Sequence, residues 1–251
     1  PYHLTLFVED LQQYPIREDV TPHLVGEWVT MDSSVREGIR QRKSSLAEGI
    51  RCLKERAIDI FITTGHTAVL VIEARRILKK EGPIALMTSL PTANKQVIFL
   101  DVGAMLSRST QDYVGLAKVG ISAQQKRGIP HPRVGLLNIG REVARGPIYL
   151  KKAHAALHRE IQSNYIGSVE GNDLFLGKAD VIVTDGFTGN VVIKTAEGIG
   201  QILEVNTPSH HNQGATLCGF SEAIMKCHGR ASPPAIASAI NEAITYLYTP
   251  K

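Results

Sequence analysis

The chain has 251 residues, of which 43% are hydrophobic and 21% charged, a composition typical of a globular protein with a large buried core. Its net charge of +4 is too small to indicate nucleic-acid binding, and no apolar run reaches the roughly 18 residues of a membrane span. Three cysteines without a C-x-x-C pair argue against a disulfide framework and a structural metal site, and are typical of a cytoplasmic protein.

Apolar periodicity predicts strands that alternate with helices along the whole chain. Strands are expected at residues 4–8, 59–63, 83–92, 96–102, 133–140 and 181–183. Helices are expected from about Ser45, at residues 68–80, 111–127 and 147–162, from residue 191 to about 204, and from Pro233 or Pro234. This alternation predicts an α/β fold with a largely parallel sheet.

The basic residues 34–43 stand directly ahead of a predicted helix start, where Ser45 and Glu48 fit a capping box. Such a basic stretch is usually a solvated face. Because an anion is also favoured near the beginning of a helix, Lys43 is a candidate contact for phosphate.

A glycine loop joins the strand at 59–63 to the helix that follows. Gly65, His66 and Thr67 place backbone N–H groups and a hydroxyl at a helix N-terminus, an arrangement that favours anion binding. His66 is also a secondary candidate to assist the chemistry, although a single loop histidine is more often a polar surface residue.

Residues 164–198 carry two loops at strand ends. The strand at 181–183 runs into Asp185-Gly-Phe-Thr-Gly-Asn190 and then into a helix, and a second loop, 169–173, follows the preceding strand. In open α/β sheets, ligands bind in the crevice outside the carboxyl ends of the strands. Asp185 and Asn190 are also residue types that cap helices, but two such loops in tandem favour a ligand site.

Motifs of other chemistries are missing. The sequence has no Gly-x-Ser-x-Gly elbow and no Walker A or G-x-G-x-x-G loop, which argues against a covalent acyl-enzyme and against a nucleotide cofactor. Phosphate is a competent nucleophile at neutral pH, and a thiol with a pKa of about 8.5 leaves readily. Attack of phosphate on a thioester then needs mainly positioning and charge stabilisation.

Several segments resemble the bacterial phosphate acyltransferases of phospholipid synthesis, which make acyl phosphate from acyl-acyl carrier protein and inorganic phosphate. The matching segments are Ile166-Gly-Ser-Val-Glu-Gly171, Gly177-Lys-Ala-Asp-Val181, Asp185 to Thr195, Arg133-Val-Gly-Leu-Leu-Asn-Ile-Gly140 and the His228-Gly229 end of the closing strand. Family members usually carry Gly-Asn-Thr-Gly where this chain has Gly65-His-Thr-Ala68.

The resemblance implies a three-layer α/β/α fold of the isocitrate and isopropylmalate dehydrogenase type, with two lobes and a cleft. Residues 1–95 with 214–251 would form the first lobe and residues 96–213 the second. The implied partners are acyl carrier protein, inorganic phosphate and a second copy in a homodimer. The resemblance also implies peripheral association with the inner face of the membrane. It implies no cofactor.

The predicted site places phosphate against the Gly65–Thr67 loop and the turn at Gly186, Thr188, Gly189 and Asn190. Lys194, one helical turn beyond Asn190, neutralises the phosphate, although it is equally interpreted as a solvated lysine. Asp185 orients groups or accepts a proton, and Asn138 holds the thioester oxygen. The remaining candidate binding residues are Lys43, Gly140, Glu170 and His228. We expect the bends after Thr64, Asn138 and Thr184 to line one hollow.

Three functions stay open from the sequence. The first is acyl phosphate formation from acyl carrier protein. The second is a phosphate acetyl- or butyryltransferase that uses acyl-coenzyme A. The third, suggested by the altered loop at His66 to Ala68, is a non-catalytic scaffold that binds the carrier protein.

Overall fold

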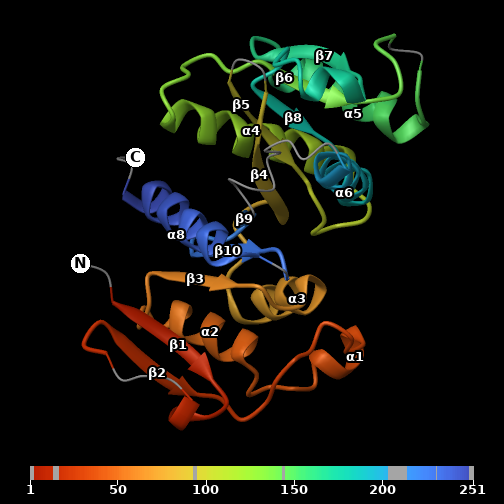
Figure 1. The fold of residues 1–251 in the computed structure, drawn as a ribbon. Helices are drawn as coiled ribbons and strands as arrows, with labels where there is room; N and C mark the ends of the chain where they lie inside the picture. The colour runs from red at the N-terminus through yellow and green to blue at the C-terminus, as the bar shows by residue number, and fades with distance from the viewer. Residues whose placement is uncertain are drawn as a thin grey trace.

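The computed structural model describes residues 3–13, 17–92, 95–142, 145–202, 214–229 and 231–248 (Figure 1). The loop histidines His210 and His211 lie outside these ranges. The strands are β1 (Leu4–Val8), β2 (Val20–Leu24), β3 (Ile60–Thr63), β4 (Ala85–Pro91), β5 (Gln96–Leu100), β6 (Val134–Leu137), β7 (Tyr165–Val169), β8 (Val181–Val183), β9 (Gly214–Cys218) and β10 (Ala223–Cys227). The α-helices are α1 (Val35–Gly38), α2 (Ser45–Lys54), α3 (Thr67–Ile77), α4 (Thr110–Lys126), α5 (Ile148–Glu160), α6 (Gly186–Ile202) and α8 (Pro233–Tyr248), and the 3-10 helices are η1 (Leu11–Gln13) and η2 (Gly171–Leu174).

Eight strands form one sheet in the order β3-β10-β9-β4-β5-β8-β6-β7, and β1 and β2 form a small parallel sheet of their own. The pair β3–β10 and the four strands from β5 to β7 are parallel. The pairs β10–β9, β9–β4 and β4–β5 are antiparallel. The expectation of a largely parallel sheet is therefore wrong for the middle of the sheet.

Short connections explain the antiparallel centre. Residues 92–95 join β4 to β5, and residues 219–222 join β9 to β10. A connection this short can pair its strands only antiparallel, whereas parallel neighbours need a crossover of a dozen or more residues.

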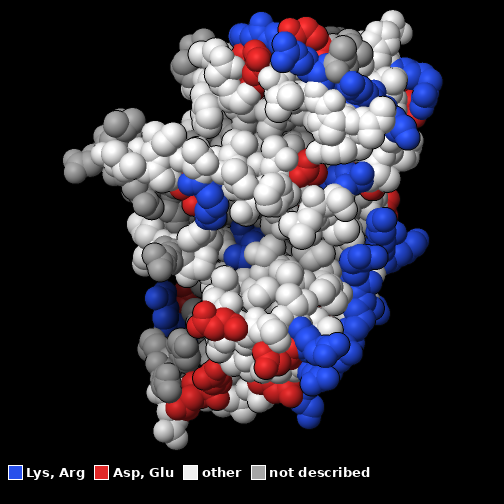
Figure 2. Space-filling model, turned by 90° about the vertical axis from the view of Figure 1, so that its right-hand side faces the viewer, with Lys and Arg blue, Asp and Glu red and all other residues white. Residues whose placement is uncertain are grey.

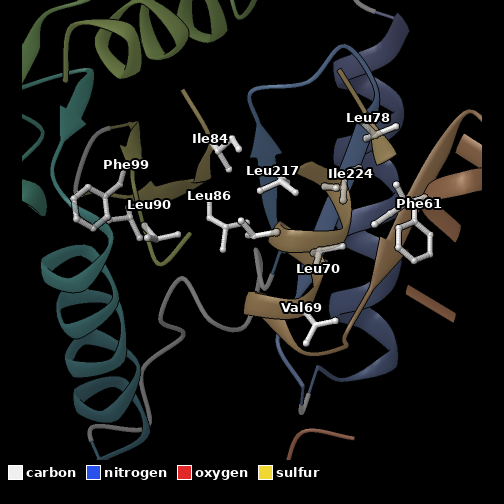
Figure 3. Packing of buried hydrophobic residues seen from close by; sticks show 14 of the residues in the cluster. Phe61, Val69, Leu70, Leu78, Ile84, Leu86, Leu90, Phe99, Leu217 and Ile224 are labelled. Carbon is white, nitrogen blue, oxygen red and sulfur yellow. The ribbon is translucent and has the colours of Figure 1, made fainter. Parts of the chain in front are cut away.

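Helices cover both faces of the large sheet, which confirms the α/β/α layering. On one face, α2, α3 and α6 pack on a core that includes Leu70, Leu86 and Phe99, and Figure 3 shows this packing from nearby. On the other face, α4 and α5 cover β5, β6 and β8, and α8 covers β10. In Figure 1, α3 and α6 lie on the same, right-hand side of the molecule. None of the helices in the described ranges is long and apolar enough to cross a membrane.

The predicted boundary between the two lobes, at residues 95–96, falls between β4 and β5. These two strands are hydrogen-bonded neighbours in the continuous sheet. The strands of each predicted lobe are contiguous in that sheet. The division into two lobes stays a prediction.

The start of α2 differs from the sequence expectation by one residue. Ser44 is the N-cap, and its hydroxyl accepts from the N–H of Ala47 at 3.5 Å. Ser44 is completely buried, so its hydroxyl has no access to water and bonds the free N–H of the helix start instead.

Candidate active site

Three loops that carry predicted site residues leave the sheet at one edge, together with the loop of Asp101. Strands β5, β8, β6 and β7 are parallel neighbours, so their carboxyl ends lie side by side. Asp101, Asp185, Asn138 and Glu170 follow these four strands within one or two residues. The structure therefore brings the predicted bends after Asn138 and Thr184 to the same edge.

Asp185 caps α6. One carboxylate oxygen accepts from the N–H of Thr188 at 2.8 Å, and the other accepts from the Thr188 hydroxyl at 3.0 Å. The side chain is buried, and its negative charge lies at the positive end of the 17-residue helix. The capping interpretation of Asp185 is thus confirmed, and a chemical role stays a prediction.

The glycines of this turn allow a close approach of α6 to the loop after β5. A Cβ on Gly189 would overlap the carbonyl oxygen of Asp101, and a Cβ on Gly186 would come within 2.8 Å of the Asp101 carboxylate. The N–H of Gly186 donates to the carbonyl of Met105 at 2.9 Å. Only a residue without a side chain fits at these two positions.

Asp101 organises the loop that receives α6. Its carboxylate is completely buried and accepts from the N–H groups of Leu86, Gly103, Ala104 and Met105 at 2.8–3.0 Å. It also forms an ion pair with Arg108, which is itself buried. A buried acid at a strand end is costly unless it is bonded, and here these bonds satisfy it.

Asn190 lies one turn into α6 and is exposed to solvent. Its amide donates to the carbonyl of Val102 at 3.4 Å, and it packs beside Gly103, which has a positive φ of 137°. Asn190 therefore joins the helix to the Asp101 loop while one side of its amide faces the edge of the sheet.

Asn138 and Glu170 stabilise their own loops. The amide of Asn138 donates to the carbonyl of Arg145 at 3.2 Å and its oxygen accepts from the N–H of Ile139 at 2.9 Å. Glu170 lies 3.5 Å from Arg141, which also pairs with the buried Asp173. Gly140 lies between these loops, next to the side chain of Glu142.

A second group of predicted residues lies at the carboxyl ends of β3 and β10, which are parallel neighbours. His66 is the N-cap of α3, and its Nδ1 accepts from the N–H of Val69 at 3.4 Å. The N–H of Gly65 donates to the Thr63 hydroxyl at 3.0 Å. A Cβ on Gly229, next to His228, would lie 3.9 Å from the Thr64 carbonyl. Gly65, His66, Thr67 and His228 are thus close together.

Lys43 makes its backbone hydrogen bond outside both groups. It lies in the loop before α2, and its backbone N–H donates to Glu27 at 2.8 Å. Its neighbour Arg42 lies 3.5 Å from the buried carboxylate of Glu73 on α3. The basic stretch is therefore attached to α3, and a phosphate contact for Lys43 stays a prediction.

Helix α6 connects the two groups. It begins at the first group, and Lys194 lies eight residues further on, about 12 Å along the axis. After burial, the positive charge of Lys194 helps to lower the pKa of Lys226. The Nζ of Lys226 donates to the Thr64 carbonyl at 3.3 Å. Lys194 itself pairs with Glu197 at 2.6 Å. Because β3 and β10 run antiparallel to β5, β8 and β6, the bend after Thr64 leaves the sheet at the opposite edge from the bends after Asn138 and Thr184, so the expectation that all three line one hollow is not confirmed.

Lys226 is the site residue that the sequence interpretation missed. It is 8% exposed on β10. Burial, and secondarily the charge of Lys194, lower its pKa from 10.5 to about 8. A lysine inside the otherwise apolar run Ala223–Cys227 was the available sequence signal. Figure 2, which faces the side with α3 and α6, shows a basic group set into a largely uncharged hollow at mid-height.

No group of three or more histidine, cysteine or acidic side chains fit to hold a metal ion occurs within the described ranges. The three cysteines are all free. Burial raises the pKa of Cys218 to about 12, so its thiol stays protonated and unreactive at neutral pH.

Solved structures share this architecture. A branched-chain phosphotransacylase from Enterococcus faecalis superimposes with a TM-score of 0.71 at 14% identity, covering 100% of this chain and 90% of its own. A putative 4-hydroxythreonine-4-phosphate dehydrogenase from Salmonella typhimurium does so with a TM-score of 0.53 at 13% identity, covering 98% of this chain and 83% of its own. These likenesses define the class: an α/β fold of the isocitrate dehydrogenase type, as the resemblance implied.

Sequence comparison identifies the family within this class. The model of the fatty acid synthesis protein family matches residues 6–206. A phosphate acyltransferase of Chlamydia felis is 36% identical over 233 residues, which cover 86% of this chain and 74% of the relative. The chain belongs to this family of phosphate acyltransferases, which confirms the resemblance and the acyltransferase prediction.

Proposed function

We propose that this phosphate acyltransferase takes its acyl group from a fatty acyl thioester of acyl carrier protein and transfers it to inorganic phosphate. An oxygen of hydrogen phosphate attacks the thioester carbon, a C–O bond forms and the C–S bond breaks. The proton of hydrogen phosphate ends on the leaving thiolate, so the products are acyl phosphate and the free carrier thiol.

The observation that carries this proposal is the course of α6. The helix begins beside Asp185, carries Asn190 in its first turn, and then carries Lys194, whose charge acts on Lys226, the residue that donates to the Thr64 carbonyl. The exposed side-chain amide of Asn190 and the two lysines supply what phosphate attack on a thioester needs: positioning and charge neutralisation.

The roles within the site follow from this arrangement. Phosphate binds beside Lys194 and the loop at Gly65–Thr67, and Gly186, Thr188, Gly189 and Asn190 place the thioester against it. Asn138 has a second amide hydrogen beyond the one donated to Arg145, and this hydrogen is aimed at the thioester oxygen. The protein acts as a homodimer in the cytoplasm, with peripheral contact to the membrane.

The test is phosphate-dependent release of carrier thiol, measured with palmitoyl-acyl carrier protein and, in parallel, with acetyl-coenzyme A. The proposal predicts release only with phosphate and preference for the carrier substrate, and a rate at least about 10-fold lower for Asn190→Ala. Preference for acetyl-coenzyme A would instead support a phosphate acetyltransferase. Binding of carrier without turnover would support a scaffold.

A further inference from the structure

Lys226 lies on the face of the sheet that α3 covers, next to the carboxyl end of β3. Side chains alternate along a strand. Met225 and Cys227 pack against α8, whereas Ile224 belongs to the core on the α3 face. Figure 3 shows Ile224 beside Leu70 of α3. Lys226 shares the face of Ile224 and is hydrogen-bonded at the carboxyl end of β3.

The surroundings of the Lys226 ammonium lack a negative charge. Its Nζ donates to the carbonyl of Thr64 at 3.3 Å and to the carbonyl of Cys227. In the described part of the chain it pairs with no carboxylate. Of the two ionisable groups that act on it, Cys227 is a thiol whose pKa is raised by burial, and Lys194 is also a cation. A buried charge without a counter-ion is costly, and native proteins rarely retain one without a use for it.

Two further features make this position favourable for an anion. The ammonium has three N–H donors, and two of them are directed at carbonyl oxygens, so one remains for a ligand. The loop that Lys226 contacts leads directly into α3, an 11-residue helix whose N-terminus begins at Thr67. The dipole of that helix favours a negative charge at the same place.

We propose that Lys226 is a phosphate-binding residue of this enzyme, with its ammonium on one side of the bound phosphate and that of Lys194 on the other. This inference rests on the proposed function and adds to it the second cation of the phosphate site. The phosphate dianion supplies the missing counter-charge, and the two lysines hold it in place for attack on the thioester.

The decisive variant is Lys226→Met, which keeps most of the length of the side chain and removes the charge. Methionine suits a buried sheet position, so this variant is expected to fold. The control is Lys118→Met on α4, where the lysine is 59% exposed and lies 3.6 Å from Glu160. Binding of inorganic phosphate is measured by titration calorimetry, and the KM values for phosphate and for acyl-carrier substrate are measured separately.

The proposal predicts that Lys226→Met raises the Kd and the KM for phosphate at least about 10-fold, the loss expected for one charge-assisted contact. The KM for the carrier substrate stays within about twofold, Lys118→Met behaves as wild type, and Lys226→Arg recovers part of the phosphate affinity. Unchanged phosphate binding in Lys226→Met would overturn the inference. The proposed function would instead be refuted if the wild-type protein bound phosphate through Lys226 but formed no acyl phosphate.

Discussion

Asp101 and Arg108 form an ion pair with side chains that are 0% and 2% exposed. The same carboxylate bonds four backbone N–H groups, including those of Gly103 and Met105. This pair fixes the loop that contacts the first turn of α6 through Gly186 and Asn190. The position of the candidate active site therefore depends on a buried structural pair that takes no part in the reaction.

Arg108→Met should destabilise the fold by about 3–5 kcal/mol, because it leaves Asp101 buried without its counter-charge. Urea unfolding followed by circular dichroism measures this. Arg159→Met is the control: Arg159 is 70% exposed in its pair with Glu160, and its loss should leave the free energy of unfolding nearly unchanged. Equal effects of the two changes would contradict the structural role given to Asp101 and Arg108.

Gly189→Ala and Gly198→Ala provide a matched comparison within α6. A Cβ at Gly189 overlaps the Asp101 carbonyl, whereas a Cβ at Gly198 meets nothing within 4 Å. Gly189→Ala should cost about 2 kcal/mol or more and lower acyl transfer, and Gly198→Ala should stabilise by up to about 1 kcal/mol. Thermal unfolding and the thiol-release assay test both. If Gly189→Ala left both the stability and the acyl transfer unchanged, α6 would not be packed against the Asp101 loop.

Two substitutions separate a chemical role of Asp185 from its role as a helix cap. Asp185→Ala removes the acceptor for the Thr188 N–H and should cost about 1 kcal/mol, whereas Asp185→Ser keeps a good N-cap. We expect both variants to have a lower kcat, and only the alanine variant to be measurably less stable. Full activity of Asp185→Ser would show that Asp185 acts only as a helix cap.

Lys226 makes stability depend on pH in a defined direction. Its folded-state pKa of about 8 lies below the reference value of 10.5, so its burial destabilises the fold at neutral pH, and this penalty disappears as the pH rises from about 8 to 10.5. The groups whose charges act on it are Lys194 on α6 and Cys227 on its own strand, while Thr63 and Thr64 on the β3 side are uncharged.

The corresponding measurement compares wild type with Lys226→Met in urea unfolding at several pH values. The variant should be more stable at pH 7, by on the order of 2 kcal/mol, and the difference should shrink between pH 8 and 10.5. Taking the difference removes the contributions of tyrosines and cysteines that do not interact with Lys226, whereas the titration of Cys227 stays coupled to it. A difference independent of pH would show that Lys226 is not buried as a charged group.

The local elements followed from the sequence because their causes are local. The apolar run Val181–Val183 predicted β8, which is present. The expected turn before a helix at residue 191 is wrong, because α6 already begins at Gly186 and residues 186–190 form its first turn, capped by Asp185. The antiparallel centre was not predicted, although the short connections of β4–β5 and β9–β10 indicate two of its three pairs; the third pair, β9–β4, depends on which strand lies beside β4. Lys226 was missed for a similar reason: its burial results from α3 and α6, which are remote from it in sequence.

Whether phosphate itself accepts the acyl group is tested most directly by incubating the protein with palmitoyl-acyl carrier protein and 32P-labelled phosphate, and separating the acyl phosphate from free phosphate by extraction into organic solvent. We expect labelled acyl phosphate in equal amount to the released thiol, and no thiol without phosphate. Thiol release at the same rate without phosphate, with no labelled product, would contradict acyl transfer to phosphate.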